Sequence, residues 1–328
     1  MIIVRVPYRV SFVGGGTDFP KYYNKYNGNV VGTTINKYCY VTIRKISNIF
    51  NYRYRIVWSK NEIENEIKNI KNPIVNEVLK YFNLKDKVEI HYQSELPKNS
   101  GIGSSSAFCV GVIQAVSEFK NLKLSKKEIA NIAIKIEQKK LKEYCGSQDQ
   151  IWSSFGGFKK IEFSKNNFKL NEIKISSKRK KKLEENLLLM FTEYQRYSKN
   201  IEKKKDERIN QNKNILDRIK ILTIDFHNFL ESKKKIHKFG DYLNQYWDLK
   251  KKLSNNVTNN HINNLYNKIL KNGALGAKLI GSGSGGFFLI YCDKPKQHRL
   301  LKTMKKNNFL NFKFCNHGAQ IIYKDDLS

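Results

Sequence analysis

Residues 97–116, PKNSGIGSSSAFCVGVIQAV, place a glycine-containing loop and three serines directly before an apolar run. The serines are of the type preferred at helix N-caps, and the apolar run that follows has the composition of a buried helix. A helix N-terminus offers unpaired N–H groups and the positive end of a dipole. Gly101 and Gly103 would let the backbone approach a ligand closely. The stretch therefore predicts an anion site, most simply for phosphate, with an ordinary serine-capped loop as the alternative.

The spacing excludes one familiar phosphate loop. A Walker A motif requires Lys-Ser or Lys-Thr directly after its second glycine, and here Ser104 follows Gly103. A nucleotide bound at this loop would therefore belong to another class of site.

Glu137 is the most informative acidic residue. The predicted helix over 126–141 has apolar residues at 129, 132, 133 and 136, and Glu137 is the next position on that stripe. A carboxylate that faces inward costs free energy unless it is paired or holds a metal ion. Glu137 is thus a candidate metal ligand. The alternative is a frayed helix end, where Glu137 would lie beside a lysine.

Asp149 lies in YCGSQDQIWSSFGG, a segment without other charges and with Trp and Phe nearby. An acid in apolar surroundings can act as a general base, whereas an Asp that caps the next helix is the alternative. Arg9 and Asp18, near the N-terminus, are further candidates, although each could be an ordinary surface charge.

Two more glycine-rich loops occur, GGGTD at 14–18 and GSGSGG at 281–286. The second fits G-x-G-x-x-G, but a dinucleotide fingerprint must open a helix, and strand-like FFLIYC follows instead. We therefore expect a turn that packs against another domain, with a plain hairpin turn as the alternative.

The elements that must position these residues mix strands and helices without regular alternation. Residues 1–45 predict strands, and 88–97 predicts a further strand that leads into the 97–107 loop. Residues 178–272 predict mainly helix, including one over 226–253, after which 276–292 returns to strand and glycine. This order favours an α+β fold. A boundary is expected near 160–180.

The composition limits the function classes. The chain has 328 residues, 40% of them hydrophobic, which is enough for one large domain or two. Its formal charge is +32, but the lysines are spread along the chain and lack the interleaved aromatic residues of single-strand binders. We expect no nucleic-acid partner and no membrane partner. The five scattered cysteines and the absence of a signal-peptide pattern predict a cytoplasmic protein.

The three loops, in this order, resemble the three motifs of the GHMP kinases. RVPYRVSFVGGGTD is similar to the first motif, PKNSGIGSSSA to the second and GAKLIGSGSGG to the third, while CGSQDQ resembles the segment that carries the catalytic Asp in sugar-kinase members. The resemblance implies a two-domain α+β fold. An N-terminal ribosomal-protein-S5-like α/β domain would cover 1–165, and a ferredoxin-like domain would cover 166–328.

The resemblance also implies a set of site residues, with ATP and Mg²⁺ as cofactors. Asp149 would accept the proton of the reacting hydroxyl, Arg9 would stabilise charge on the transferring phosphoryl group, and Ser105 with Glu137 would hold the metal. The expected ATP-binding residues are Pro97, Ser100, Gly101, Ile102, Gly103, Ser104, Ser105 and Ser106. The expected substrate-binding residues are Gly15, Gly16, Thr17, Asp18, Arg196, Gly283 and Ser284.

Within the family, GGGTD, CGSQDQIWSSFGGF and FTEYQRYSKNI resemble segments of kinases that act on D-glycero-D-manno-heptose 7-phosphate. The expected reaction transfers the ATP γ-phosphate to the anomeric hydroxyl and gives the 1,7-bisphosphate. Arg196 would hold the phosphate of the substrate, with Arg44, Arg53 and Lys98 as alternatives. Glu193 departs from the pattern, since those kinases usually have Gly there.

Two other functions stay open at this point. One is a GHMP kinase for an unphosphorylated sugar such as fucose or galactose, and the other is a basic RNA-binding protein without kinase activity. ATP turnover with and without RNA would separate them. The expected partners are ATP and a sugar phosphate, and a homodimer is left open.

Overall fold

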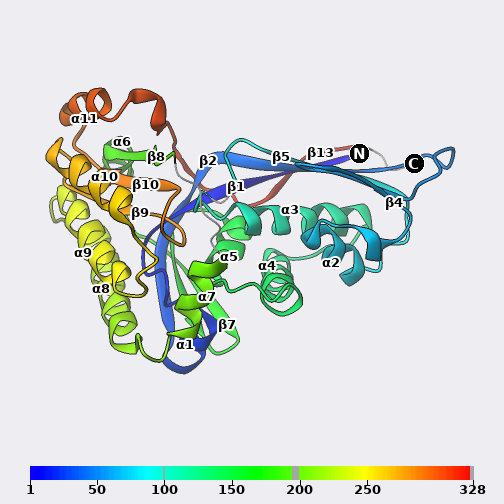
Figure 1. Ribbon diagram of the computed structural model, residues 1–328, viewed down its shortest axis with the longest axis horizontal. Helices are drawn as coiled ribbons and strands as arrows, with labels where there is room; N and C mark the ends of the chain where they lie inside the picture. The colour runs from blue at the N-terminus through cyan, green and yellow to red at the C-terminus, as the bar shows by residue number, and fades with distance from the viewer. Residues whose placement is uncertain (99, 194–198, 326–328) are drawn as a thin grey trace.

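The computed structural model describes residues 1–98, 100–193 and 199–325. Two sheets and the helices packed on them make up the molecule, with the chain termini at the far end of the larger sheet (Figure 1). The α+β class expected from the sequence is confirmed.

The larger sheet is built on two long strands, β1 (Ile2–Val13) and β2 (Gly28–Lys45), which pair antiparallel from Ile2↔Ile43 to Val13↔Val31. Their apolar residues are buried, as the alternation in the sequence indicates. The central order is β13-β1-β2-β5-β3-β4, and β6 and β12 also pair with β2. The other strands are β3 (Tyr54–Val57), β4 (Asn61–Glu64), β5 (Val88–Ser94), β6 (Lys159–Ser164), β7 (Asn167–Glu172), β12 (Phe314–Cys315) and β13 (Gln320–Lys324).

Helices cover one face of this sheet. The central helix is α3 (Ser104–Phe119), which packs against β1 and β2 and is buried along most of its length. Around it lie α2 (Pro73–Tyr81), α4 (Lys126–Ile134) and α5 (Gln148–Phe155), while the short α1 (Pro20–Tyr26) precedes β2. A short 3-10 turn, η1 (Ile67–Asn69), precedes α2.

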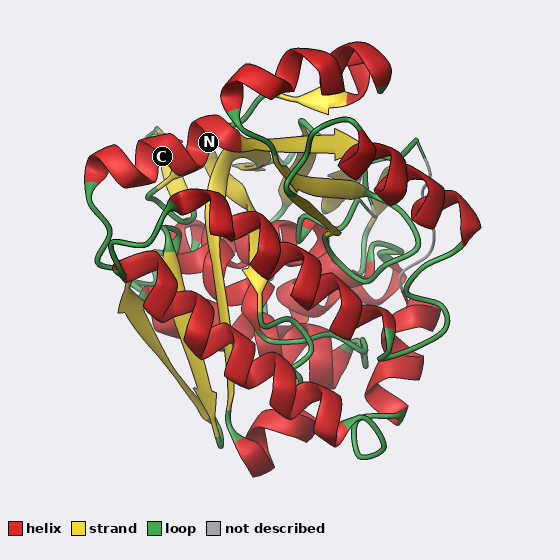
Figure 2. Ribbon diagram, turned by 90° about the vertical axis from the view of Figure 1, so that its left-hand side faces the viewer, coloured by secondary structure: helices red, strands yellow, loops and turns green. Residues whose placement is uncertain are grey.

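The smaller sheet has the order β11-β8-β10-β9, with all its pairs antiparallel. Its strands are β8 (Leu187–Phe191), β9 (Gly276–Leu279), β10 (Phe287–Tyr291) and β11 (Phe309–Leu310). The helices of this half are α6 (Ser177–Asn186), α7 (Lys199–Glu207), α8 (Lys213–Glu231), α9 (Phe239–Lys251), α10 (Asn260–Lys271) and α11 (Gln297–Thr303), with 3-10 turns η3 (Ile236–Lys238), η4 (Lys294–Lys296) and η5 (Lys306–Asn308). Helices lie in front of the strands in the view of Figure 2.

The prediction of a single helix over 226–253 is wrong. The chain leaves helical geometry at Ser232, whose ψ of 169 is extended, and α9 begins only at Phe239. The break lets α8 pack against β2 of the larger sheet while α9 packs against β9 of the smaller sheet. One straight helix could not make both of these contacts.

Strands from beyond residue 165 belong to the larger sheet. β7 extends it through β6, and the C-terminal segment returns to it as β12 and β13, where Gln320 pairs with Arg5. The division at 165/166 stays a prediction for the domain limits, whereas the sheet itself is assembled from both sides of that position.

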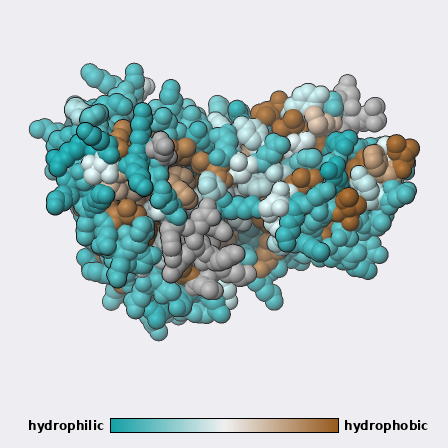
Figure 3. Space-filling model, turned by 45° about the horizontal axis from the view of Figure 1, so that its top comes forward, coloured by the Kyte–Doolittle hydropathy of each residue, from teal (hydrophilic) through white to brown (hydrophobic). Residues whose placement is uncertain are grey.

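Hydrophilic side chains cover most of the face shown in Figure 3, with small hydrophobic groups toward the end where β4 and the termini lie. Some surface lysines have carboxylate partners, such as Lys68 with Glu66 and Lys324 with Glu118. Among the described residues, no helix combines the length and the apolar character needed to cross a membrane.

Candidate active site

A pocket lies where the larger sheet, the 101–106 loop and the C-terminal half meet. The first and second glycine-rich loops, the CGSQDQ segment and helices α7 and α9 all contribute to its wall. It is lined by Arg9, Ser11, Gly15, Gly16, Asp18, Phe19, Gly101, Gly103, Ser104, Ser105, Ser106, Glu137, Glu143, Tyr144, Cys145, Gly146, Gln148, Asp149, Glu202, Lys205, Tyr246, Lys250, Leu253, Lys278, Gly281 and Ser282. Residues far apart in the sequence therefore converge on one site.

The serines of the 101–106 loop do not cap α3, which corrects the sequence expectation. Ser104 is already the first helical residue, and the N-cap is Gly103 in the left-handed conformation with φ of 77°. No side chain accepts a hydrogen bond from the first turn. The helix N-terminus thus keeps N–H groups available to an anion, while the hydroxyls are used elsewhere.

The third glycine-rich loop packs against the second. A Cβ placed on Gly281 would lie 2.3 Å from the Cα of Gly101, so only glycine allows the two backbones to approach this closely. This confirms the expected turn against another part of the chain. The strand β10 follows it, which agrees with the exclusion of a dinucleotide fingerprint.

Glu137 faces the loop from a π-helical turn, η2 (Lys135–Lys140), that continues α4. Its side chain accepts hydrogen bonds from Ser106 Oγ at 2.7 Å, Ser105 Oγ at 3.2 Å and Gln150 Nε2 at 2.5 Å. The residue is 3% exposed, so the frayed-end alternative is wrong. Burial raises the pKa of the Glu137 carboxyl to about 7, in spite of the hydrogen bonds that favour its charged form.

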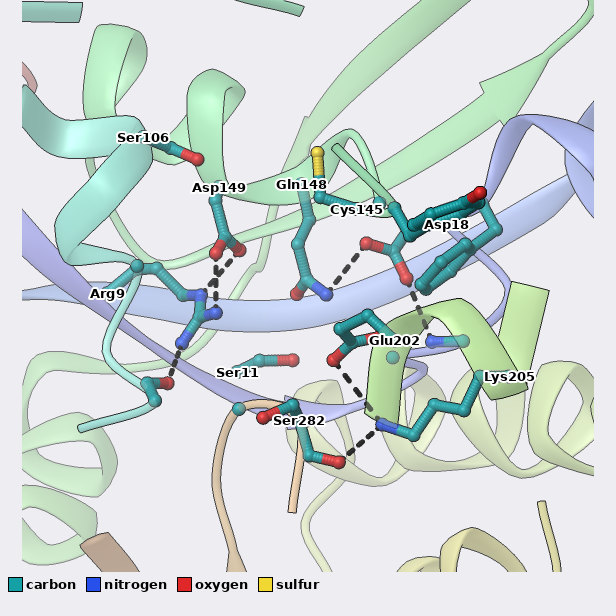
Figure 4. Close-up of a pocket in the computed structure, with 18 of the residues that line it drawn as sticks. Arg9, Ser11, Asp18, Ser106, Cys145, Gln148, Asp149, Glu202, Lys205 and Ser282 are labelled. Carbon is teal, nitrogen blue, oxygen red and sulfur yellow. Dashed lines mark hydrogen bonds and ion pairs between the residues drawn. The ribbon is translucent and has the colours of Figure 1, made fainter. Parts of the chain in front are cut away.

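Asp149 and Arg9 form a two-point ion pair on one side of the pocket (Figure 4). Arg9 Nε and Nη2 each donate to a different oxygen of Asp149 at 2.7 Å, and Arg9 Nη1 donates to the carbonyl of Gly101 at 2.5 Å. Asp149 is the second residue of α5 and makes no cap. Apolar surroundings were expected for Asp149, but the neighbouring Ile151 and Trp152 are buried in the core while Asp149 faces a guanidinium.

Asp18 is buried on the other side of the pocket. It accepts hydrogen bonds from the Gly16 N–H and from Gln148 Nε2, both at 2.8 Å. Burial raises the pKa of the Asp18 carboxyl to about 6, and the negative charge of Asp149 contributes in the same direction. Asp18 is therefore held as an acceptor that faces the same space as Asp149, which suits hydrogen bonds from a polyhydroxylated ligand.

The pKa of Asp18 predicts a pH-dependent stability. Its folded-state pKa, about 6, lies above the ordinary value of 3.8, so between these values the folded chain binds a proton that the unfolded chain lacks. The free energy of unfolding should therefore fall as the pH rises through this window, by about 3 kcal/mol from this group. Asp18→Asn lacks the titration. In urea unfolding from pH 3.5 to 7, the free energy of unfolding of the variant should rise by about 3 kcal/mol relative to that of the wild type. A difference between the two proteins that does not change with pH would contradict this prediction.

Several expected site residues lie behind the pocket wall. The Thr17 hydroxyl donates to Gly14 and Asn29 carbonyls, and Ser100 donates to the Pro97 carbonyl, so both fold the loops instead of facing ligand. Ile102 is buried and its carbonyl accepts from Arg9 N–H. In the third loop, Gly281 and Ser282 line the pocket, whereas Gly283 and Ser284 pack toward Val257 and Asn256.

Arg196 falls outside the described residues and stays a prediction. Of its alternatives, Arg44 pairs with Glu89, Arg53 donates to the Lys85 carbonyl, and Lys98 lies over the Trp58 ring, so none of these three lines the pocket. Sequence reasoning missed the pocket residues Ser11, Gln148, Lys205, Lys250 and Lys278. A signal existed for Lys278, a charged residue inside the otherwise apolar strand GAKL.

Comparison with protein families agrees with this geometry. The GHMP kinases N terminal domain matches residues 67–157, and the GHMP kinases C terminal domain matches residues 227–309. The chain is 32% identical to D-glycero-alpha-D-manno-heptose 7-phosphate kinase of Campylobacter jejuni, over 97% of this chain and 98% of the relative. It is 28% identical to mevalonate kinase of Methanocaldococcus jannaschii over 74% of this chain and 78% of the relative.

Solved structures share the fold. A D-glycero-D-manno-heptose 1-phosphate kinase of Bacteroides thetaiotaomicron superposes with a TM-score of 0.79 at 24% identity, over 99% of this chain and 100% of that one. Lactococcus lactis galactokinase, in complex with galactose, superposes with a TM-score of 0.74 at 17% identity, over 97% and 94%. Together with the two domain matches and the whole-length relative, they show that this chain belongs to the GHMP kinase family and is an ATP-dependent phosphotransferase of its two-domain α+β fold.

Proposed function

We propose that the chain transfers the γ-phosphoryl group of ATP to the anomeric hydroxyl of D-glycero-D-manno-heptose 7-phosphate and releases the 1,7-bisphosphate and ADP. The support that carries most weight is the 32% identity, over nearly the whole of both chains, to a heptose 7-phosphate kinase. The pocket also brings Asp18, Asp149 and Arg9 together with the N-terminal end of α3, an arrangement that suits a sugar acceptor beside a nucleotide.

Asp149 and Arg9 would act on the reacting atoms. A carboxylate within hydrogen-bond reach of the anomeric hydroxyl can accept its proton as the oxygen attacks the γ-phosphorus. Arg9 holds both Asp149 oxygens through Nε and Nη2, which fixes the direction in which the carboxylate can accept. The same guanidinium carries positive charge to the point where negative charge spreads over the transferring group.

The 101–106 loop and Glu137 would hold the nucleotide phosphates and Mg²⁺. The free N–H groups at the start of α3 would bind phosphate oxygens. One buried carboxylate beside two serine hydroxyls supplies hard oxygen donors, which fits a Mg²⁺ ion that takes its remaining ligands from phosphates and water. When bound, the ion would neutralise charge on the β- and γ-phosphates. Glu137 and Ser105 are the residues of this chain that would contact it.

Asp18, with Gly15 and Gly16 beside it, would orient the sugar. Its oxygens already accept from Gly16 and Gln148, and each retains capacity for a sugar hydroxyl. Gln148 Oε1 is buried and has no hydrogen-bond partner among the described residues, so it offers a further acceptor.

The test is an acceptor panel with the purified protein and Mg-ATP. D-glycero-D-manno-heptose 7-phosphate, the same heptose without phosphate, fucose and galactose are compared by kcat/KM, and products are identified by NMR. The proposal expects the phosphorylated heptose to be preferred and its C1 to be modified. Equal or better use of an unphosphorylated sugar would replace it with a kinase of the fucose or galactose type.

A further inference from the structure

Three buried lysines line the same pocket from the C-terminal half. Lys205 comes from α7, Lys250 from α9 and Lys278 from β9, and they are 8%, 4% and 2% exposed. Lysines this deeply buried are rare unless they are paired with an acid or another anion. Lys205 is paired with Glu202, whereas Lys250 and Lys278 are not, so these two in particular require an explanation beyond folding.

Two of them donate to backbone carbonyls and lie over aromatic rings, Lys278 over Tyr246 at 4.2 Å and Lys250 over Trp247 at 5.7 Å from the ring centroid. Lys250 Nζ donates to the carbonyls of Leu279 at 2.8 Å and Gly281 at 2.7 Å, and Lys278 Nζ donates to those of Ser11 and Phe12 at 2.8 and 2.9 Å. Within the described residues, neither ammonium has a carboxylate within 4.0 Å. One of the three N–H groups of Lys250 is left without a hydrogen-bond acceptor there.

The charges also repel one another. Burial lowers the pKa of both Lys250 and Lys278 well below its usual value, and the nearby cations Lys205 and Arg9 lower it further. Such a cluster is stabilised when an anion enters, because the anion favours the charged form of each lysine. Glu202, which lines the same end of the pocket, acts in the opposite direction on the pKa of Lys250. Three lysines face this one carboxylate there, so the local charge favours an anionic ligand.

Lys205 is the member best placed to reach a ligand. Its Nζ lies 3.4 Å from Glu202 Oε1 and donates to the Ser282 carbonyl. In Figure 4 it enters from the side opposite Arg9 and Asp149, with Ser11 and Ser282 between them. Ser11 is 6% exposed, and its hydroxyl has no hydrogen-bond partner in the described part of the chain, so a donor to a ligand oxygen faces the same space.

We propose that Lys205, Lys250 and Ser11, in the positive field of Lys278, form the subsite that binds the phosphate group carried by the acceptor. This rests on the proposed function, in which the acceptor is a sugar phosphate. An acceptor whose anomeric hydroxyl lies at Asp149 must place the far end of the sugar away from the 101–106 loop. Lys205 reaches the pocket from the side opposite Arg9 and Asp149 (Figure 4), where it could meet that end of the sugar, whereas the phosphates of ATP have the loop and the start of α3.

The test compares Lys205→Met with the wild type and with Lys203→Met, a control on the same helix whose lysine is exposed and pairs with Glu207. For each protein, kcat/KM is measured with D-glycero-D-manno-heptose 7-phosphate and with the unphosphorylated heptose. The ratio of the two values should fall about 10- to 100-fold in Lys205→Met, the effect of one charged hydrogen bond. Lys203→Met should keep the wild-type ratio, and Lys205→Arg should restore part of it.

The outcomes separate the subsite from the function. If the wild type prefers the phosphorylated heptose, with a kcat/KM ratio well above one, and Lys205→Met has the same ratio, the subsite is overturned and the proposed function stands. If kcat/KM falls by the same factor with both acceptors, or if the KM for ATP rises, Lys205 acts on nucleotide binding or folding. Either result overturns the subsite. A wild-type ratio near one removes the proposed function, and the subsite with it. Thermal unfolding of each variant shows that the proteins compared are folded.

Discussion

Asp149→Asn is expected to lower kcat by about 10²–10⁴-fold, the usual cost of losing a general base. The substitution keeps the shape of the side chain, but an amide cannot take a proton at neutral pH. It also offers one oxygen to Arg9 where the carboxylate offers two, so the two-point pair seen at 2.7 Å is lost. The measurement is a single-turnover assay with saturating Mg-ATP and acceptor, which reports the chemical step without product release.

Nucleotide affinity separates this result from a folding defect. The hydrogen bonds of the Asp149 side chain go to Arg9 and, within the described residues, not to the serines of the 101–106 loop, so the Kd for a non-hydrolysable ATP analogue should stay within about twofold of wild type. Asp248→Asn is the matched control, because Asp248 is exposed and pairs with Lys251 on α9. A near-normal turnover rate in Asp149→Asn would remove Asp149 from the role of base.

Glu137→Gln is expected to stabilise the protein and to weaken its use of Mg²⁺. The folded-state pKa of Glu137 is about 7 against an ordinary 4.5, so the free energy of unfolding falls as the pH rises through that window. At pH 8 and without metal or nucleotide, the variant should gain about 3 kcal/mol at most, because it removes the buried charge. The Mg²⁺ concentration for half-maximal rate should rise about 10- to 100-fold.

Both effects have direct readouts. Urea unfolding at pH 4 and pH 8 tests the stability, and the gain should be absent at pH 4, where Glu137 is protonated in the folded state. A Mg²⁺ titration of the rate tests the metal. Glu118→Gln is the control, since Glu118 lies on α3 and pairs with Lys324 near the C-terminus. An unchanged Mg²⁺ titration would make Glu137 a structural residue.

Much of the site could be predicted from the sequence because its chemistry is concentrated in short segments. The loop at 97–107 reads locally as glycine followed by a helix start, and the structure has α3 beginning at Ser104. Glu137 stood out because an acid interrupted an apolar stripe of period 3.6, and such a residue must be buried. Local pattern and burial are linked for elements of this kind, so the α+β class and the inward Glu137 followed without tertiary information.

The hydrogen-bond partners of the loop serines and of Asp149 could not be predicted from the local sequence pattern. The serines were expected to cap α3, but a hydroxyl bonds whichever partner lies closer, and Glu137 arrives from a different helix at 2.7 Å from Ser106. Likewise, Asp149 was expected in apolar surroundings because its sequence neighbours are apolar. Its partner is Arg9, 140 residues away, and only the pairing of β1 with the rest of the sheet places that guanidinium there.

The burial of two of the three clustered lysines, Lys205 and Lys250, was decided by tertiary structure alone. Among 61 Lys and Arg residues, sequence gives no reason to choose Lys205 or Lys250, because each sits in a run of exposed lysines on a charged helix. Their burial depends on where α7 and α9 pack against the third glycine-rich loop, and that packing needs Gly281 to touch Gly101 across the molecule. The sequence by itself determined the glycine-serine loop before a helix, the inward acid and the fold class, since these are local consequences of residue type and period. The tertiary structure decided which charges meet, because electrostatic interactions depend on distance in space and on burial, neither of which is encoded by spacing along the chain.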